Sequence, residues 1–137
     1  MFVRVMYTTL FVRDQDEALD FYTGKLGLAK RGDHRVPDAS AWGLELGRWL
    51  SLGYEGQDMQ VILASGMPGP GHANLGHSVL DRGELFLESD DLRKDFETLT
   101  AKGVQFLEPA PEDYPFGVRA TALDPSGNRV SLRQRRA

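Results

Sequence analysis

The chain has 137 residues, a formal net charge of −4 and 41% hydrophobic residues, which is typical of one globular domain or two small fused units. Its 16 Lys and Arg are outnumbered by 20 Asp and Glu, and without a basic stripe neither nucleic acid nor a membrane surface is an expected partner. The absence of cysteine excludes disulfides, thiolate catalysis and cysteine-based metal sites, and it is compatible with a cytoplasmic location.

A strand and a helix are predicted at the start of the chain. Residues 3–12 (VRVMYTTLFV) are rich in β-branched and aromatic side chains, and Arg4 interrupts them, so they predict a strand rather than a signal peptide. Asp14 is expected to cap a helix, with Glu17 at the spacing of a capping box. Gly27 is expected to end that helix.

Further strands and a linker follow in the first half. Alternating or apolar patterns predict strands at residues 28–36, 42–46 (WGLEL), 48–53 (RWLSLG) and 59–64 (MQVILA). Residues 65–78 are rich in Gly and Pro and lack periodicity, which predicts a linker.

The second half repeats this order. A strand is predicted at 83–89, followed by a helix that Asp91 caps and Gly103 ends. Residues 112–117 (EDYPFG) are expected to form a loop and 124–128 (DPSGN) a tight turn. The remaining short strands are predicted at 104–109, 118–124 and 129–134.

The shared order indicates an internal duplication. Tyr22 and Leu99 each lie eight residues beyond the aspartate that caps their helix, Asp14 or Asp91. The sequence therefore predicts two βαβββ modules within a single domain. Their expected bounds are about 1–64 and about 79–137, with the linker at about 65–78.

Three segments carry a family resemblance: TLFVRDQDEALDFYTGKLGLAKR (9–31), LFLESDDLRKDFETLTAKGVQFLEP (85–109) and FGVRATALDPSGNRVSLRQ (116–134). With their V-x-D, F-Y, L-G and D-P-x-G-N motifs, they resemble the vicinal oxygen chelate superfamily, which includes glyoxalase I, bleomycin-resistance proteins and extradiol dioxygenases. The resemblance implies an α+β fold in which two βαβββ modules form a half-open barrel around a pocket. It also implies a homodimer.

Metal-dependent members of that superfamily take their ligands from the first and last strand of each module. Carried over, the resemblance places Tyr7 and Glu84 at the first-strand positions, and Gln60 and Ser131 at the last-strand positions. Neutral Ser and Tyr hydroxyls are poor ligands for Zn²⁺, Ni²⁺ or Fe²⁺. We therefore expect neither a tightly held metal nor another cofactor, although a divalent metal remains the alternative.

Large aromatic residues near loops and strand ends are the other pocket candidates. Trp49, Tyr114 and Phe116 could form aromatic walls, with the latter two as a lid, or they could pack in the core or a dimer interface. Arg119 and Arg133 could meet an anion, but pairing with the acidic excess is the expected role.

The predicted function is the binding of a small aromatic or cationic molecule in the pocket, as in resistance-type members of the superfamily. One alternative is a metal-dependent lyase, isomerase or dioxygenase, with His72 or His77 helping Glu84 and Gln60. Another is metal-free acid–base catalysis by Glu84 with Tyr7, which requires a desolvated Glu84 rather than an exposed one. The expected partners are a small-molecule ligand and a second copy of the chain.

Overall fold

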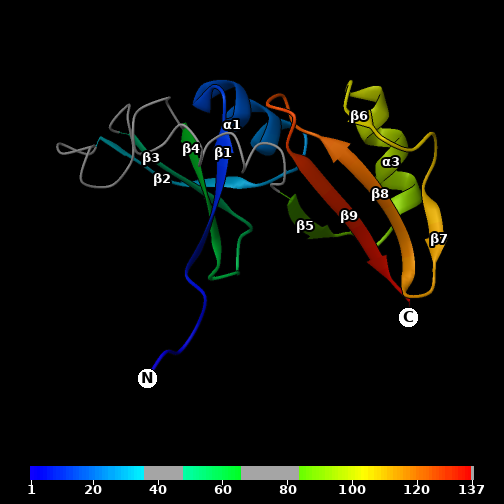
Figure 1. Ribbon diagram of the computed structural model, residues 1–137, viewed down its shortest axis with the longest axis horizontal. Coiled ribbons are helices and arrows are strands. Elements are labelled where there is room, and N and C mark those ends of the chain that lie inside the picture. The colour runs from blue at the N-terminus through cyan, green and yellow to red at the C-terminus, as the bar shows by residue number, and fades with distance from the viewer. Residues whose placement is uncertain (36–47, 66–83, 137) are drawn as a thin grey trace, which may run out of the picture.

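The structure is a computed structural model that describes residues 1–35, 48–65 and 84–136. The N-terminal unit consists of β1 (Tyr7–Val12), α1 (Gln15–Gly24), β2 (Ala29–Arg35), β3 (Arg48–Gly53) and β4 (Gln60–Ser65) (Figure 1). The C-terminal unit consists of β5 (Glu84–Glu88), α3 (Leu92–Ala101), β6 (Gln105–Phe106), β7 (Glu112–Tyr114), β8 (Gly117–Leu123) and β9 (Arg129–Arg135).

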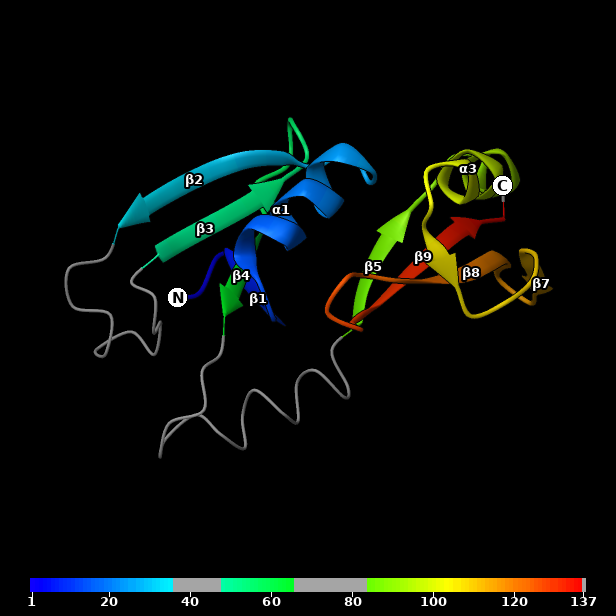
Figure 2. The same ribbon diagram turned by 90° about the horizontal axis from the view of Figure 1, so that it is seen from above.

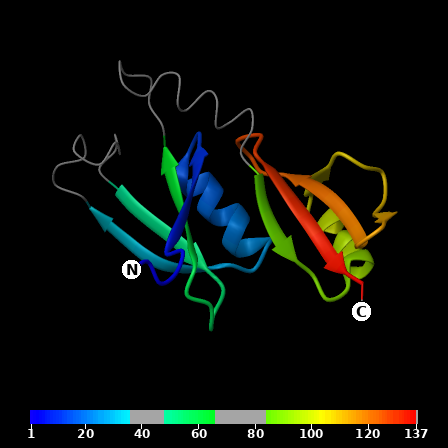
Figure 3. The ribbon, with the colours of Figure 1, turned by 60° about the horizontal axis from the view of Figure 1, so that its bottom comes forward.

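Each unit forms its own sheet, and in both sheets the first strand of the unit lies at the edge beside the last strand. The first sheet has the order β1-β4-β3-β2, and the second has the order β5-β9-β8-β6 with β7 added beside β8. The first strand of each unit runs parallel to its last strand. The predicted α+β class with a repeated unit is confirmed, and the two sheets lie side by side without closing into one barrel in the described residues (Figure 3).

Both helices begin at the aspartates that the sequence predicts as caps. The Asp14 carboxylate accepts a 2.9 Å hydrogen bond from the amide of Glu17, and the Asp91 carboxylate accepts one of 3.2 Å from the amide of Lys94. Glu17 does not complete a capping box by bonding back to the cap, because its carboxylate accepts a 2.7 Å bond from Arg13.

The helices also end in equivalent ways. The amide of Leu28 donates to the carbonyl of Tyr22, and the amide of Val104 donates to the carbonyl of Leu99, each at 3.0 Å. These are the two residues that lie eight positions beyond the caps, so the duplicated register extends to the helix ends. Gly103 supplies the left-handed conformation that such an ending requires, with φ of 87°.

Some predicted elements differ from the structure. The first strand begins at Tyr7 rather than residue 3, and the segment before it extends away from the body of the protein (Figure 1). Residues 112–117 are not all loop, since Glu112–Tyr114 pair with β8 as β7. The predicted strand at 42–46 and the predicted linker beyond Ser65 lie outside the described residues.

Each helix packs on one face of its own sheet, and α1 also lies toward the C-terminal unit (Figure 2). One apolar cluster joins both units, and no helix in the described ranges is long and apolar enough to span a membrane. The cluster includes Leu10, Val12, Phe21, Tyr22, Leu50, Leu52, Val61, Leu63, Leu85, Leu92, Leu99, Ala120, Ala122, Val130 and Leu132.

Candidate functional site

Strand alternation places three predicted pocket residues on one face of the first sheet, the face turned away from α1. Leu10, Leu50 and Val61 belong to the core beneath the helix. Side chains at odd spacings from them point to the opposite side of the sheet. By this alternation Tyr7, Trp49 and Gln60 lie on what we call the non-helix face, and the equivalent side of the second sheet carries the same name.

These three residues are close to one another. Tyr7 lies directly opposite Gln60 in the parallel pairing of β1 with β4. The rings of Tyr7 and Trp49 meet edge to face, with centroids 5.3 Å apart, and Tyr7 is 39% exposed. An edge-to-face aromatic pair beside an amide side chain is a surface to which a flat molecule could bind.

Ser131 lies on the non-helix face of the second sheet, in the middle of β9. Its side chain is buried, and its hydroxyl accepts a 2.8 Å hydrogen bond from Nε of Arg133. Glu84 lies on the same face, opposite Arg129 at the start of β5. Glu84 is exposed, so the burial that acid–base catalysis by this carboxylate requires is absent in the single chain.

The strand register shows that Gln60 and Ser131, which the resemblance treats as equivalent, do not occupy equivalent places in the two sheets. Tyr7 pairs with Gln60, whereas Glu84, its counterpart in the repeat, pairs with Arg129. In the same way Ser131 lies opposite Phe86, and the residue in the corresponding place of the first sheet is Ile62, opposite Thr9. The counterpart of Ser131 is therefore Ile62 rather than Gln60.

The donor set does not suit a catalytic divalent ion. The four carried-over positions offer one carboxylate, from Glu84, and otherwise neutral oxygens. If Ile62, which corresponds to Ser131 by strand register, is counted in place of Gln60, the set has one oxygen fewer. Within the described ranges, no three His, Cys, Asp or Glu side chains are grouped in a way that could hold a metal ion. The four carried-over residues and the rest of the described ranges therefore do not fit the metal of the metal-dependent relatives, whereas His72 and His77 lie outside the described residues.

Aromatic and guanidinium groups gather on the non-helix face of the second sheet. Tyr114 and Phe116 meet edge to face at 5.9 Å. The guanidinium of Arg133 lies 5.1 Å from the ring centroid of Tyr114 and 5.2 Å from that of Phe86. The guanidinium of Arg119 lies 5.5 Å from the Tyr114 ring. These are cation–π distances, so aromatic rings are the contacts of both guanidinium groups within this cluster.

Two members of this cluster differ from the sequence-based expectation. Phe86 was not predicted as a site residue, although its alternation with Leu85 and Leu87 on a strand could have indicated it. Arg133 was expected to pair with an acidic residue, and this is wrong for the described residues. The nearest strand neighbour that could pair with it, Glu88, instead accepts two bonds from Arg135.

The D-P-x-G-N turn joins the two units rather than contributing to the non-helix face. The carboxylate of Asp124 accepts hydrogen bonds from the Tyr22 hydroxyl (2.8 Å), the Ser126 amide (2.9 Å), and both the amide (2.8 Å) and side-chain nitrogen (3.0 Å) of Asn128. That side-chain nitrogen also donates to the carbonyl of Phe11 at 2.7 Å. Burial, reinforced by the Asp124 carboxylate, raises the pKa of Tyr22.

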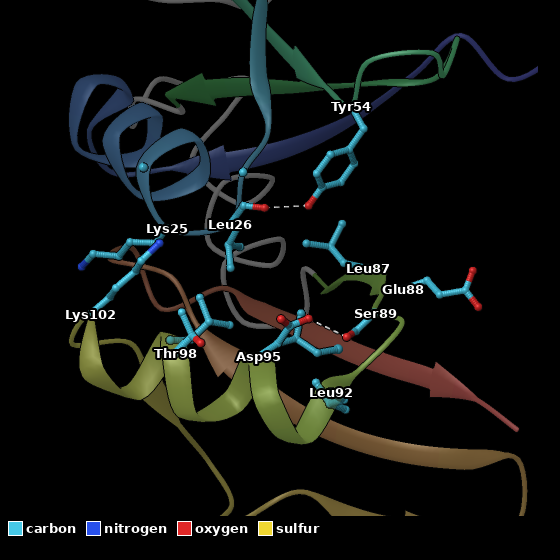
Figure 4. Close-up of a pocket in the computed structure, with 14 residues that line it drawn as sticks. Lys25, Leu26, Tyr54, Leu87, Glu88, Ser89, Leu92, Asp95, Thr98 and Lys102 are labelled. Atoms are coloured by element: carbon cyan, nitrogen blue, oxygen red, sulfur yellow. Dashed lines mark hydrogen bonds between the residues drawn. The ribbon is translucent and has the colours of Figure 1, made fainter.

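A cavity of about 290 Å³, which we call the junction cavity, lies between the end of α1 and the length of α3 (Figure 4). Leu26 and Tyr54 line it from the N-terminal unit, and Leu87, Leu92 and Leu99 from the C-terminal unit. None of the seven predicted pocket residues contributes to its wall. Residue types alone could not have located it, because its lining comes from segments far apart in the chain.

Two hydrogen bonds join residues that line this junction cavity. The Tyr54 hydroxyl donates to the carbonyl of Leu26 at 2.8 Å, and the Ser89 hydroxyl donates to Asp95 at 2.6 Å. Burial, with a smaller contribution from the Asp95 carboxylate, raises the pKa of Tyr54. The cavity is at the small end of the range for ligand pockets, and the charged residues Lys25, Glu88 and Lys102 also line it.

Comparisons with known proteins agree with the fold. The family model of the Glyoxalase/Bleomycin resistance protein/Dioxygenase superfamily matches residues 4–132. TnmS3, an antibiotic binding protein from Streptomyces sp. CB03234, is 26% identical, with a TM-score of 0.76 and coverage of 98% of both chains. UcmS2 is 31% identical, with a TM-score of 0.77 and coverage of 96% of this chain and 98% of its own.

A relative from Shewanella frigidimarina, described as an uncharacterised protein, is 28% identical over 131 residues. The match covers 95% of this chain and 92% of the relative. The similarity therefore extends over nearly the full length of both sequences.

Proposed function

This chain belongs to the glyoxalase/bleomycin resistance protein/dioxygenase superfamily, and we propose from that premise that it binds a small aromatic molecule without a tightly held metal ion. The observation that carries the proposal is the grouping of aromatic side chains on the two non-helix faces. Tyr7 with Trp49 on the first sheet and Tyr114 with Phe116 on the second are edge-to-face pairs that remain partly accessible.

The similarity to TnmS3 supports a binding role. That protein is described as an antibiotic binding protein, and it matches this chain from end to end. The full-length similarity in architecture supports a binding surface of the same kind in this chain. The aromatic pairs indicate a flat ligand.

The binding unit we propose is a homodimer in the cytoplasm. β1 and β5 lie at the edges of the two sheets that the described residues form, and the non-helix faces beside them are only partly covered in the single chain. A second copy could cover the ligand with its own sheet and enclose it more fully. The enzymatic alternatives receive less support, because Glu84 is exposed and the four carried-over positions supply a single carboxylate.

The test is a binding screen with planar compounds of one to four fused rings, each supplied as the carboxylate, the carboxamide and the aminomethyl form. A rise in melting temperature identifies binders, and titration calorimetry measures their affinity. We expect at least one ring system to bind saturably and to lose roughly tenfold or more in affinity in Trp49→Ala or Phe116→Ala, since such aromatic contacts carry much of the affinity of small sites.

Thr98→Phe is the matched control, because Thr98 lines the junction cavity and is exposed on α3. An added ring there should narrow that cavity and leave ligand affinity unchanged. If Thr98→Phe abolishes binding while the aromatic variants bind normally, the ligand occupies the junction cavity and the proposal is wrong. Absence of binding by the whole series would also contradict it.

A further inference from the structure

Arg133 is the feature of the second sheet that the proposed function leaves unexplained. It is half-buried on the non-helix face, and in the described part of the chain no carboxylate lies within ion-pair distance of it. In a chain with an excess of acidic residues, a half-buried guanidinium without a carboxylate partner is unexpected. Its contacts are instead the Ser131 hydroxyl and two aromatic rings.

The geometry around Arg133 holds the guanidinium in one place. Nε donates to Ser131 at 2.8 Å, and the rings of Phe86 and Tyr114 flank the group at 5.2 and 5.1 Å. Because Nε is occupied, the two terminal nitrogens remain, with four N–H groups between them. Two parallel N–H groups of this kind match the two oxygens of a carboxylate.

A second arginine increases the positive charge at this place. Arg119 lies directly opposite Arg133 in the pairing of β8 with β9, and both guanidinium groups lie near the Tyr114 ring. Like charges directly opposite across two strands destabilise a sheet. The nearest carboxylate is that of Glu112, whose oxygen is 3.7 Å from Nε of Arg119, at the outer limit of an ion pair. An anion between the two arginines would relieve their repulsion.

The other charged residues on this face do not neutralise the positive charge of Arg119 and Arg133. Glu88 is engaged by Arg135, while Glu84 and Arg129 lie at the far end of β5 and β9. Counted over the face, Arg119, Arg129, Arg133 and Arg135 exceed Glu84, Glu88 and Glu112 by one charge.

We infer that Arg133, seated on Ser131 between Phe86 and Tyr114, determines specificity at this site, and that the ligand class is the aromatic carboxylates. The inference rests on the proposed function and sharpens it, because the sequence left an aromatic or a cationic ligand open. A cationic ligand would meet the guanidinium of Arg133, which has no carboxylate partner in the described residues, and that of Arg119, which Glu112 contacts only at 3.7 Å. The exposed rings of Phe86 (59%) and Phe116 (74%) would contact the ligand's ring, and the terminal nitrogens of Arg133 would bind its carboxylate.

The experiment compares 2-naphthoate, 2-naphthamide and 2-naphthylmethylamine, or the same three forms of whichever ring system binds best in the screen. These probes share one ring system and differ in charge. Calorimetry on the wild-type protein should rank the carboxylate roughly tenfold or more tighter than the carboxamide, as expected for charge-assisted hydrogen bonds, and the ammonium form weakest. The preference for the carboxylate should shrink as salt is raised.

Arg133→Gln should abolish the preference for the carboxylate while leaving affinity for the carboxamide within about threefold of wild type, since only the charge-assisted bonds are lost. Arg133→Lys should give an intermediate preference, because it keeps the charge and loses the paired N–H groups. Ser131→Ala should weaken carboxylate binding without affecting the carboxamide. A general loss of structure would weaken all three probes equally.

Arg129→Gln is the matched control, since it removes an equal charge from the same strand and face at a position away from the aromatic rings. If it reduces the carboxylate preference as much as Arg133→Gln, the effect is one of net charge and the inference is overturned. If the carboxamide or the ammonium form binds as tightly as the carboxylate, the inference fails while the proposed function stands. If no form of any ring system binds, both fail.

Discussion

The hydroxyl of Tyr22 in α1 donates a 2.8 Å hydrogen bond to the carboxylate of Asp124, which lies 102 residues further along the chain in the turn between β8 and β9. Both side chains are buried, with exposed fractions of 0% and 5%. The F-Y and D-P-x-G-N motifs that carry the family resemblance therefore meet in one bond between the two units.

Tyr22→Phe tests the value of that bond. Asp124 would keep its three other donors, so we expect the variant to fold. Its free energy of unfolding should fall by about 2 kcal/mol, the value expected for a hydrogen bond to a charged group. Urea denaturation measures it. Tyr54→Phe is the control, because its half-buried hydroxyl bonds to a neutral carbonyl and should cost about 1 kcal/mol or less. An equal loss in the two variants would contradict the prediction.

The same tyrosine predicts a dependence on alkaline pH. Burial raises the pKa of Tyr22 above the ordinary value of 10.0, so the folded protein keeps a proton that the unfolded chain releases near that pH. The contribution of Tyr22 to the free energy of unfolding is therefore fully present below pH 10. It is lost as pH rises beyond 10, by up to about 1.4 kcal/mol per pH unit.

Urea midpoints between pH 8 and pH 11 would show this as a narrowing gap between wild type and Tyr22→Phe. A gap that stays constant above pH 10 would show that Tyr22 ionises alike in the folded and unfolded states, and one that widens would show a lowered pKa; either result would contradict the prediction.

Two glycines with positive φ are predicted to respond differently to alanine. At Gly103 a new Cβ would meet nothing within 4 Å, so Gly103→Ala should cost about 1 kcal/mol from backbone strain alone. At Gly117, with φ of 148°, the new Cβ would lie 2.0 Å from the backbone oxygen of Gln134 on β9. Gly117→Ala should therefore prevent folding or separate β8 from β9. Circular dichroism melting curves that showed similar stability for the two variants would refute this.

Metal retention is predicted to be far below one ion per chain. The prediction is checked by incubating the protein with Mn²⁺, Fe²⁺, Ni²⁺ or Zn²⁺, desalting it, and measuring bound metal by elemental mass spectrometry. Its reason is the chemistry of Tyr7, Gln60, Glu84 and Ser131, which offer a single carboxylate. Near-stoichiometric retention that Glu84→Ala abolished, and that the control Glu112→Ala did not, would reveal a metal site built from other ligands.

Local signals predicted the helices of this protein well. Asp14 and Asp91 cap them through bonds to residues three positions away, and such contacts are visible in the sequence itself. The glycine after α3 and the DPSGN turn are of the same kind. The segment before Tyr7 was wrongly included in a strand, because composition alone does not show where a pairing partner ends.

The site was predictable only in part. Alternation assigns Ser131 and Arg133 to one face of β9, but the sequence could not show that Arg135 would bind Glu88 and leave Arg133 without a carboxylate among the residues that the structure describes. The register of β4 against β1, which sets Ile62 rather than Gln60 as the counterpart of Ser131, also depends on pairing between distant strands. The roles of the seven predicted pocket residues remain predictions.

The Tyr22–Asp124 bond between the units also determines which halves can pair with each other. Leu99 occupies in α3 the place of Tyr22 in α1, and Tyr54 begins the turn after β3 as Asp124 begins the turn after β8. The two halves are thus no longer interchangeable. A symmetric protein made from two C-terminal halves would place a leucine against each Asp124 and leave the carboxylate without its tyrosine donor. One made from two N-terminal halves would lack the carboxylate altogether. The Tyr22–Asp124 bond can therefore form only between one N-terminal and one C-terminal half, and this asymmetry would favour that pairing of halves during folding.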